Sequence, residues 1–316
     1  MNPNPPNFSH ADDLNTIGNL STEQPNPRTE KIDELSTLEM VQLINREDRA
    51  VIDAVERATP QIAKAIDAIV EQLKVGGRLV YIGAGTSGRL GVLDASECLP
   101  TFGVGEEAVV GIIAGGDRAL RHPVEAAEDS RESAIEDLQK IDFNEQDILC
   151  AIASSGRTPY CIGGLEYGKS IGARTISLAC VAESLVGQLA DYPIEAVVGQ
   201  EVITGSTRMK SGSAQKMVLN MLSTGSMIKL GKVFGNLMVD VRATNEKLVE
   251  RTRQMVMQAI NLEYEQAVAL LKESGGSVKV EIVMGLVHCS KQEAEALLIR
   301  HDGVIKLAIA EVNGDE

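Results

Sequence analysis

Residues 79–91 have the sequence LVYIGAGTSGRLG, in which an apolar run leads directly into a loop rich in Gly, Ser and Thr. A short apolar strand that ends in such a loop and continues into a helical pattern is typical of a parallel α/β sheet. Glycine lets the backbone N–H groups of the loop approach a ligand closely, and the start of the following helix attracts anions. We therefore expect this stretch to form a buried strand and one wall of an anion-binding site.

Similar apolar runs recur further along the chain, with helical patterns between them. Together with the first run, they predict strands at residues 79–82, 109–113, 148–153, 175–178 and 196–198. The clearest helical patterns between strands lie at residues 123–138 and 159–170. Apolar strands that alternate with helices predict an α/β fold: a doubly wound five-stranded parallel sheet with helices on both faces, an αβα sandwich.

Four segments are predicted along the chain: a disordered tail (1–18), an N-terminal helical segment (19–57), the α/β domain (58–235) and a small helical C-terminal region (236–316). The tail is rich in Asn and Pro and shows no periodicity. In the second segment, Ser36 and Glu39 have the spacing of a helix capping box, and Pro60 is expected to start a second helix. Ser290 and Glu293 have the same capping-box spacing near the C-terminus.

Composition and charge restrict what this chain can bind. The 316 residues carry a formal net charge of −15, which counts against a nucleic-acid partner. Aromatic residues make up 3% and Trp is absent, so a sugar would be held by polar groups and backbone rather than by stacking. No apolar run approaches the ~20 residues of a membrane span, and no signal pattern opens the chain. We expect a cytoplasmic protein that contacts neither membrane nor nucleic acid.

Cysteine and histidine spacing gives no sign of a disulfide framework or a metal site. The cysteines are widely spaced and most lie in or beside apolar runs, which is typical of buried thiols in a reducing compartment. They are Cys98, Cys150, Cys161, Cys180 and Cys289. The histidines, which lack metal-ligand spacing, are His10, His122, His288 and His301. No metal is expected.

Three of the predicted strands end in loops made of Gly, Ser and Thr. Ligands of open parallel sheets bind beyond the carboxyl ends of the strands, so these loops are expected to meet there. Neutral donors at helix starts would hold a phosphate monoester, which explains how an acidic protein binds an acidic ligand. The candidate phosphate-binding residues are Gly85, Thr86, Ser87 and Gly88 after the first strand, Ser154, Ser155, Gly156 and Thr158 after the third, and Ser206, Thr207 and Lys210 after the fifth.

A nucleotide ligand is the first alternative for these loops. Gly83, Gly85 and Gly88 match the spacing of the dinucleotide fingerprint, but the acidic residue expected about 20 residues later is missing. The phosphate-loop pattern GxxxxGK[ST] is also absent, and no cofactor is expected. Three arginines near the loops stay open between anion binding and surface ion pairs: Arg89, Arg157 and Arg208.

Several longer strings point to one family. They are YIGAGTSGRLG at 81–91, DASEC at 94–98, EDS at 128–130, GSTRMKSGSAQK at 205–216 and KVFGNLMVD at 232–240. The loops resemble the sugar isomerase (SIS) domain, and the longer strings resemble the N-acetylmuramic acid 6-phosphate etherase family, from about residue 20 to about residue 300. The chain departs from the family at Leu99, where Pro is usual and the turn after Glu97 could shift, and at Ala126, where Gly is usual.

The resemblance implies a lyase of cell-wall amino-sugar recycling. The family cleaves the D-lactyl ether of N-acetylmuramic acid 6-phosphate to N-acetylglucosamine 6-phosphate and D-lactate, by elimination and then water addition. This chemistry needs an acid and a base in one pocket but no metal or redox cofactor. By resemblance, Glu97 protonates the departing lactate and Glu128 is the base, with the division of roles open. Asp94 shares a helix face with Glu97 and stays open as a helper or an exposed residue.

The resemblance also implies a homodimer whose sites draw residues from both chains, with a phosphorylated amino sugar as the small-molecule substrate. Two other functions of SIS domains stay open: an aldose–ketose isomerase and a sugar-phosphate sensor. A DNA-binding sensor needs a basic helix-turn-helix module, which this acidic chain does not favour. The strings at 94–98 and 128–130 favour the etherase over both.

Overall fold

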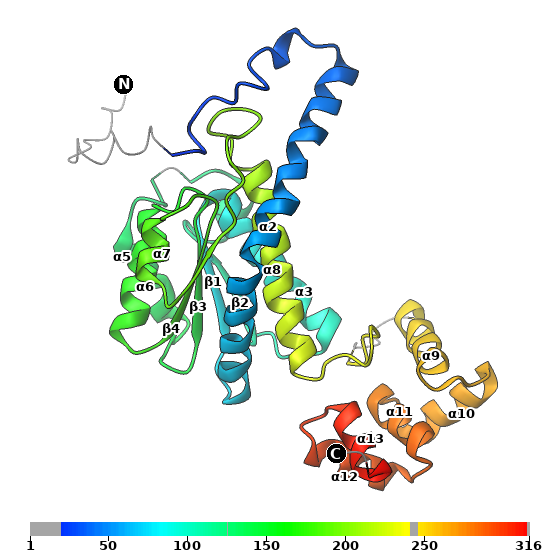
Figure 1. Ribbon diagram of the computed structural model, residues 1–316. Helices are drawn as coiled ribbons and strands as arrows, with labels where there is room; N and C mark the ends of the chain where they lie inside the picture. Colours follow the sequence, from blue (N-terminus) through cyan, green and yellow to red (C-terminus); the bar gives the residue numbers. More distant parts are fainter. Residues whose placement is uncertain (1–19, 125, 241–245, 315–316) are drawn as a thin grey trace. The chain divides into compact units, whose positions relative to one another are not determined.

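The computed structural model describes residues 20–124, 126–240 and 246–314 (Figure 1). Its strands are β1 (Leu79–Gly83), β2 (Val109–Ile113), β3 (Ile148–Ile152), β4 (Arg174–Ala179) and β5 (Tyr192–Glu195). They form one sheet in the order β2-β1-β3-β4-β5. In the register of the parallel β3–β4 and β4–β5 pairs, Ile148 lies opposite Arg174 and Ile176 lies opposite Tyr192. The predicted doubly wound five-stranded parallel sheet is confirmed.

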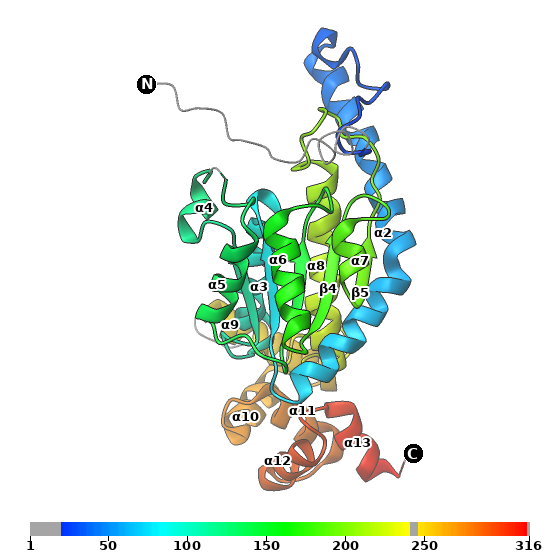
Figure 2. The same cartoon turned by 90° about the vertical axis from the view of Figure 1, so that its left-hand side faces the viewer.

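Helices surround the sheet and make up the whole C-terminal part. Those before and within the sheet region are η1 (Ile32–Glu34), α2 (Thr37–Lys74), α3 (Gly85–Phe102), α4 (Asp117–Arg121), α5 (Arg131–Lys140), α6 (Pro159–Ser170), α7 (Leu185–Leu189) and α8 (Lys210–Lys229). The C-terminal helices are α9 (Glu246–Ile260), α10 (Tyr264–Ser274), α11 (Val278–Val287), α12 (Lys291–Arg300) and α13 (Ile305–Asn313). Figures 1 and 2 show α5, α6 and α7 on one face of the sheet, and the first turns of α3 and α8 on the other.

The chain divides into two compact units. Unit 1 comprises Met1–Ala65, Val80–Val92 and Gly111–Leu219, and unit 2 comprises Ile66–Leu79, Leu93–Val110 and Asn220–Glu316. This division runs through α2, α3 and α8. The segment boundaries after residues 57 and 235 stay a prediction. The predicted tail, residues 1–18, lies outside the described residues.

The expected helix break at Pro60 is wrong, because α2 is one continuous helix of 38 residues with Pro60 inside it. Proline has no N–H to donate to the carbonyl four residues earlier, here Glu56. The Thr59 hydroxyl donates to that carbonyl instead, at 2.8 Å. A neighbouring side chain therefore satisfies the acceptor that Pro60 leaves open, and the helix continues.

The predicted capping boxes are both present. Ser36 N donates to Glu39 Oε2 at 3.0 Å, and Glu39 N donates to Ser36 Oγ at 3.4 Å. Ser290 and Glu293 make the same reciprocal pair at the start of α12, at 2.8 and 3.4 Å. The side chains at these two helix starts thus satisfy backbone donors as the spacing indicated.

The fifth strand and the helix after β1 differ from the prediction. Strand β5 lies just before the predicted residues 196–198 and contains Pro193. Proline has no N–H to donate to a neighbouring strand, but β5 is an edge strand, with one side unpaired, and edge strands tolerate proline. Helix α3 continues to Phe102, well beyond the expected end near Glu97. Leu99 therefore lies inside a helix rather than in a turn.

The core follows the apolar pattern of the strands. Every residue of β1 and β3 is buried, as expected for a parallel sheet covered on both faces. Cys98, Cys150, Cys161 and Cys180 are buried free thiols, and Cys289 is half-buried. In unit 2, the C-terminal helices share their own apolar core, which includes Val256. None of the helices in the described part of the chain is long and apolar enough to cross a membrane.

Candidate functional site

A cavity of about 470 Å³ lies in unit 1 at the carboxyl ends of β1 and β3. In the sheet, β2 lies on one side of β1 and β3 on the other, so the direction of winding reverses between these two strands. Such a switch point is where open α/β sheets bind their ligands. The topology therefore places a ligand site at this cavity.

The cavity brings together most of the residues that the sequence singled out. Loops from β1 and β3 supply most of its hydroxyl groups, and the loop before α8 supplies one more. The predicted residues that line it are Gly85, Thr86, Ser87, Glu128, Ser154, Ser155, Thr158 and Thr207. Thr158 is the N-cap residue of α6, yet its side chain makes no capping hydrogen bond. The Ser and Thr residues thus form a donor-rich part of the wall beside two helix starts, an arrangement that suits an anion.

Gln215, a fully buried residue of α8, connects two of these hydroxyl groups. Ser87 Oγ donates to Gln215 Oε1 at 3.0 Å, and Gln215 Nε2 donates to Ser154 Oγ at 2.9 Å. The Ser154 oxygen accepts this bond and also lies 3.5 Å from Ser87 Oγ, to which it can donate because the Ser87 proton is used by Gln215. No individual signal pointed to Gln215, although it lies in the quoted string 205–216.

Two of the predicted glycines allow close packing of the backbone and do not line the cavity. A Cβ on Gly88 would lie 2.5 Å from Gly83 O, so glycine allows the first turn of α3 to pack against β1. Gly156 has a φ of +68°, and a Cβ there would lie 2.4 Å from the Ser184 Cβ. Both positions require glycine for close approach, and neither lines the cavity.

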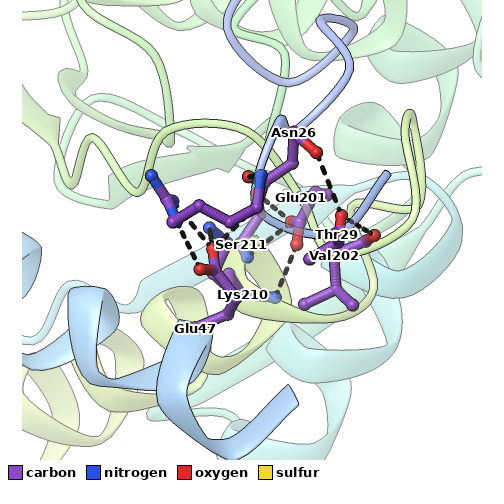
Figure 3. A network of polar contacts seen from close by, with 8 residues as sticks. Asn26, Thr29, Glu47, Glu201, Val202, Lys210 and Ser211 are labelled. Carbon is purple, nitrogen blue, oxygen red and sulfur yellow. Dashed lines mark hydrogen bonds and ion pairs between the residues drawn. The ribbon is translucent and has the colours of Figure 1, made fainter. Parts of the chain in front are cut away.

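Lys210, which the sequence placed with the phosphate ligands, lies elsewhere (Figure 3). Its side chain is fully buried, and its Nζ pairs with Glu47 Oε2 at 3.3 Å. The start of α8 is also occupied, because the Glu201 carboxylate accepts bonds from Lys210 N and Ser211 N, both at 2.9 Å. The donors expected for phosphate here are already satisfied by protein carboxylates. Ser206 likewise does not line the cavity, where this loop contributes only Gly205 and Thr207.

Glu128 lies on the cavity wall, in the turn before α5. Its carbonyl accepts a hydrogen bond from Tyr160 N at 3.0 Å, which fixes the turn against the start of α6. Ser130 caps α5 by accepting from Ser133 N at 3.0 Å. Partial burial of the carboxyl group and the adjacent charge of Asp129 raise the pKa of Glu128. The residue is still exposed, so a ligand can reach a carboxylate of increased basicity.

Glu97 does not line this cavity. It is exposed on α3, 11 residues after Thr86, which corresponds to roughly 16 Å along the helix axis. Asp94 on the same helix is buried and accepts hydrogen bonds from Asn220 Nδ2 at 2.7 Å and Ser223 Oγ at 3.1 Å. Asp94 is therefore a packing residue, and Glu97 is the carboxylate of this string that a second molecule can reach.

The three arginines that could either bind an anion or form surface ion pairs lie in three different places. Arg89 donates to the carbonyls of Ala119 at 2.7 Å and Leu120 at 3.1 Å, so it holds the end of α4. Arg157 lines the cavity, where it supplies a positive charge, and Arg208 is exposed outside it.

Apart from Arg157, six further lining residues were not among the predicted site residues: Leu20, Glu23, Ala84, Asp129, Pro159 and Gly205. Leu20 and Glu23 precede the first long helix in a stretch without periodicity or a motif of its own. The family resemblance begins near residue 20 and so includes this stretch, but it singled out neither Leu20 nor Glu23.

The chain is similar to several known proteins. Residues 61–169 match the family model of the glucokinase regulatory protein N-terminal SIS domain. Over 298 residues, the chain is 56% identical to an N-acetylmuramic acid 6-phosphate etherase of Glaesserella parasuis serovar 5, covering 94% of this chain and 98% of that one. An etherase of the same name from Clostridium botulinum strain Hall is 55% identical over 298 residues, covering 94% and 99%. Among solved structures, a phosphoheptose isomerase from Francisella tularensis covers 60% of this chain and 97% of its own, with 18% identity and a TM-score of 0.44.

The parallel sheet, the switch-point cavity and the matched domain model define a SIS-domain protein. The identity to the etherases exceeds half of the aligned residues and extends over nearly the full length of both partners. The chain belongs to the N-acetylmuramic acid 6-phosphate etherase family.

Proposed function

We propose that this protein cleaves the D-lactyl ether of N-acetylmuramic acid 6-phosphate, giving N-acetylglucosamine 6-phosphate and D-lactate in cell-wall amino-sugar recycling. The observation that carries the proposal is one cavity that combines a donor-rich wall with Glu128, a carboxylate of raised pKa. Membership of the etherase family supplies the substrate.

The donor-rich wall suits the phosphate group of this substrate. Thr86 lies in the first turn of α3, where backbone N–H groups have no partner within the helix. Ser155 and Thr158 add hydroxyl groups from the loop after β3, and Arg157 adds a positive charge. Helix starts and neutral donors stabilise a phosphate dianion without a strongly basic pocket.

Glu128 is proposed to act as the base. On the open-chain aldehyde it takes the proton from C2, which the neighbouring carbonyl acidifies, and the C3–O bond to lactate then breaks. Glu97 donates a proton to the departing lactate oxygen. Water then adds its oxygen to C3 of the unsaturated aldehyde and C2 regains a proton, so the product differs from the substrate by lactyl replaced with hydrogen. Two carboxyl groups carry out these transfers, and the proposal assigns no cofactor or metal.

A homodimer with sites shared between the subunits is proposed, as the family resemblance implies. Glu97 is exposed on α3, so a second copy of the chain can reach it. In unit 1, the first half of α2 also exposes an apolar stripe, with Leu38, Val41 and Ile52 exposed to 67%, 54% and 56%. These residues are 3 and 11 positions apart, which places them on one helix face. Exposed apolar stripes of this kind mark association surfaces.

Mixing two inactive variants tests the shared site. Glu97→Ala and Glu128→Ala each remove one carboxylate, so each homodimer is expected to be inactive. Subunits exchanged between the two variants can form a site with both carboxylates, and about a quarter of the sites in a fully mixed population should regain activity. A mixture that stays inactive after proven exchange contradicts sites shared between subunits.

Enzyme assay with the purified chain tests the reaction itself. With N-acetylmuramic acid 6-phosphate as substrate, D-lactate and N-acetylglucosamine 6-phosphate should appear in equal amounts, and Glu128→Gln should abolish both. Glu132→Gln is a matched control, because Glu132 is exposed on α5 and lies outside the cavity. A sugar phosphate converted to its ketose without lactate would identify an isomerase instead. A cytoplasmic location is also proposed, since the four buried free thiols suit a reducing compartment.

A further inference from the structure

A segment before the first long helix forms part of the cavity wall. This N-terminal strap, residues 20–29, has no regular helix or strand, yet Leu20 and Glu23 line the cavity. The strap therefore brings a carboxylate to the site from outside the sheet region. The mechanism proposed above does not use it.

Two hydrogen bonds tie the strap to the loop before α8. Gly205 N donates to Thr22 O at 3.1 Å, and Thr29 Oγ1 donates to Val202 O at 2.8 Å. Thr22 and Thr29 are both buried. Because the bonds lie near the two ends of the strap, they fix its path along the cavity.

An ion-pair cluster around the buried carboxylate of Glu47 holds the middle of the strap (Figure 3). Asn26 Nδ2 donates to Glu47 Oε2 at 2.7 Å, and Arg28 donates to both Glu47 oxygens, through Nε at 2.5 Å and Nη2 at 2.8 Å. Lys210 Nζ approaches the same carboxylate to 3.3 Å. Charge-assisted bonds to one buried carboxylate make a rigid anchor. The strap is thus a fixed wall and positions Glu23 accurately.

The carboxylate of Glu23 has acceptor capacity to spare. Thr22 Oγ1 donates to Glu23 Oε1 at 3.4 Å, a long bond. Glu23 Oε2 lies against Gly205, where an added Cβ would come within 3.2 Å of it. A carboxylate can accept about four hydrogen bonds, and Glu23 is half-buried on the cavity wall, so a ligand in the cavity can reach it.

The charges of the cavity give a ligand one orientation. A phosphate group is repelled by carboxylates and fits the donor-rich wall formed by residues such as Thr86 and Ser155. Glu23 must then face the uncharged part of the ligand, where hydroxyl and amide N–H groups are the available donors. We propose that Glu23 is a substrate-recognition residue that accepts hydrogen bonds from the hydroxyl or amide N–H groups of a phosphorylated amino sugar.

This inference rests on the proposed function for the identity of its ligand, so its test measures binding as well as catalysis. The probes are N-acetylglucosamine 6-phosphate and inorganic phosphate, titrated calorimetrically into wild type, Glu23→Gln and Glu23→Ala. Glu30→Gln is the matched control, because Glu30 is an exposed carboxylate next to the strap that does not line the cavity.

The expected result is selective. Glu23→Ala weakens binding of the sugar phosphate about tenfold or more, the loss expected for a hydrogen bond to a charged group, and leaves inorganic phosphate within about twofold of wild type. Glu23→Gln lies between, because its amide oxygen still accepts, and Glu30→Gln behaves as wild type. In steady-state kinetics, Glu23→Ala and Glu23→Gln should raise KM more than they lower kcat.

Three results would overturn the inference. Unchanged sugar-phosphate binding in both Glu23 variants removes the residue from recognition. Equal weakening of both probes shows that the strap merely supports the cavity. Loss of kcat at unchanged KM and unchanged binding makes Glu23 an acid or base instead. If wild type releases no lactate while Glu23 still controls sugar-phosphate binding, the proposed reaction fails and the inference stands.

Discussion

Replacing Glu47 with Gln removes the charge at the centre of the cluster that anchors the strap while keeping the shape of the side chain. Hydrogen bonds from Arg28, and then from Asn26 and Lys210, outweigh burial and lower the pKa of Glu47 from 4.5 to about 2. One pKa unit corresponds to about 1.4 kcal/mol, so the ionised carboxylate stabilises the folded protein by about 3 kcal/mol. This stabilisation includes the ion pair with the fully buried Lys210, which the substitution leaves without its charged partner.

The pH dependence of this effect has a definite sign. The pKa is lower in the folded state, so the stabilisation is fully present above pH 4.5 and is lost as the pH falls from about 4.5 towards about 2. Urea unfolding followed by circular dichroism should therefore show Glu47→Gln about 3 kcal/mol less stable than wild type at pH 7, with a smaller difference at pH 3. Glu56→Gln, an exposed change on the same helix, should stay within about 0.5 kcal/mol. A Glu47→Gln protein as stable as wild type at pH 7, or a difference that does not shrink in acid, would refute the role assigned to the cluster.

Three further predictions concern the site and its supports. Ala126 has a φ of +59°, a backbone conformation that is strained for alanine but not for glycine. Ala126→Gly should therefore raise the free energy of unfolding by about 1 kcal/mol, and a loss of stability in thermal unfolding would show that the backbone is not strained here. Ser155→Ala should raise KM several-fold with little change in kcat, and unchanged steady-state kinetics would place the phosphate elsewhere. Gln215→Ala should lower kcat/KM about tenfold because the hydroxyls of Ser87 and Ser154 lose their common partner, and wild-type kinetics in a folded variant would show that this orientation is unimportant.

Much of the fold was predictable because it depends on local patterns. The strands carry continuous apolar runs, and those runs need only short segments of sequence to be recognised. The errors arose where the expected effect of a proline was offset by its structural surroundings. Thr59 satisfies the carbonyl that Pro60 leaves open, and an edge position makes Pro193 harmless in β5. A rule about one residue cannot anticipate a partner of this kind.

The site was predictable where backbone geometry determines it, and not where distant side chains do. Thr86 and Ser155 follow strand ends directly, so topology alone brings them together. Lys210 lies in an equally suggestive loop, but its partner Glu47 is 163 residues away in the chain. Glu23 reaches the cavity through a strap in which Thr29 is tied to Val202, 173 residues away in the chain. Long-range pairing of polar side chains leaves no periodic trace in a sequence.

In the proposed reaction, Glu128 in this cavity takes the C2 proton and Glu97 assists the departure of lactate. The most direct measurement is NMR of the sugar phosphate during reaction in deuterated water. Wild type should give N-acetylglucosamine 6-phosphate with deuterium at C2. Glu97→Gln should introduce deuterium at C2 of the substrate without releasing lactate, and Glu128→Gln should do neither. Deuterium exchange that persists in Glu128→Gln, or a wild-type product without deuterium at C2, would contradict the account.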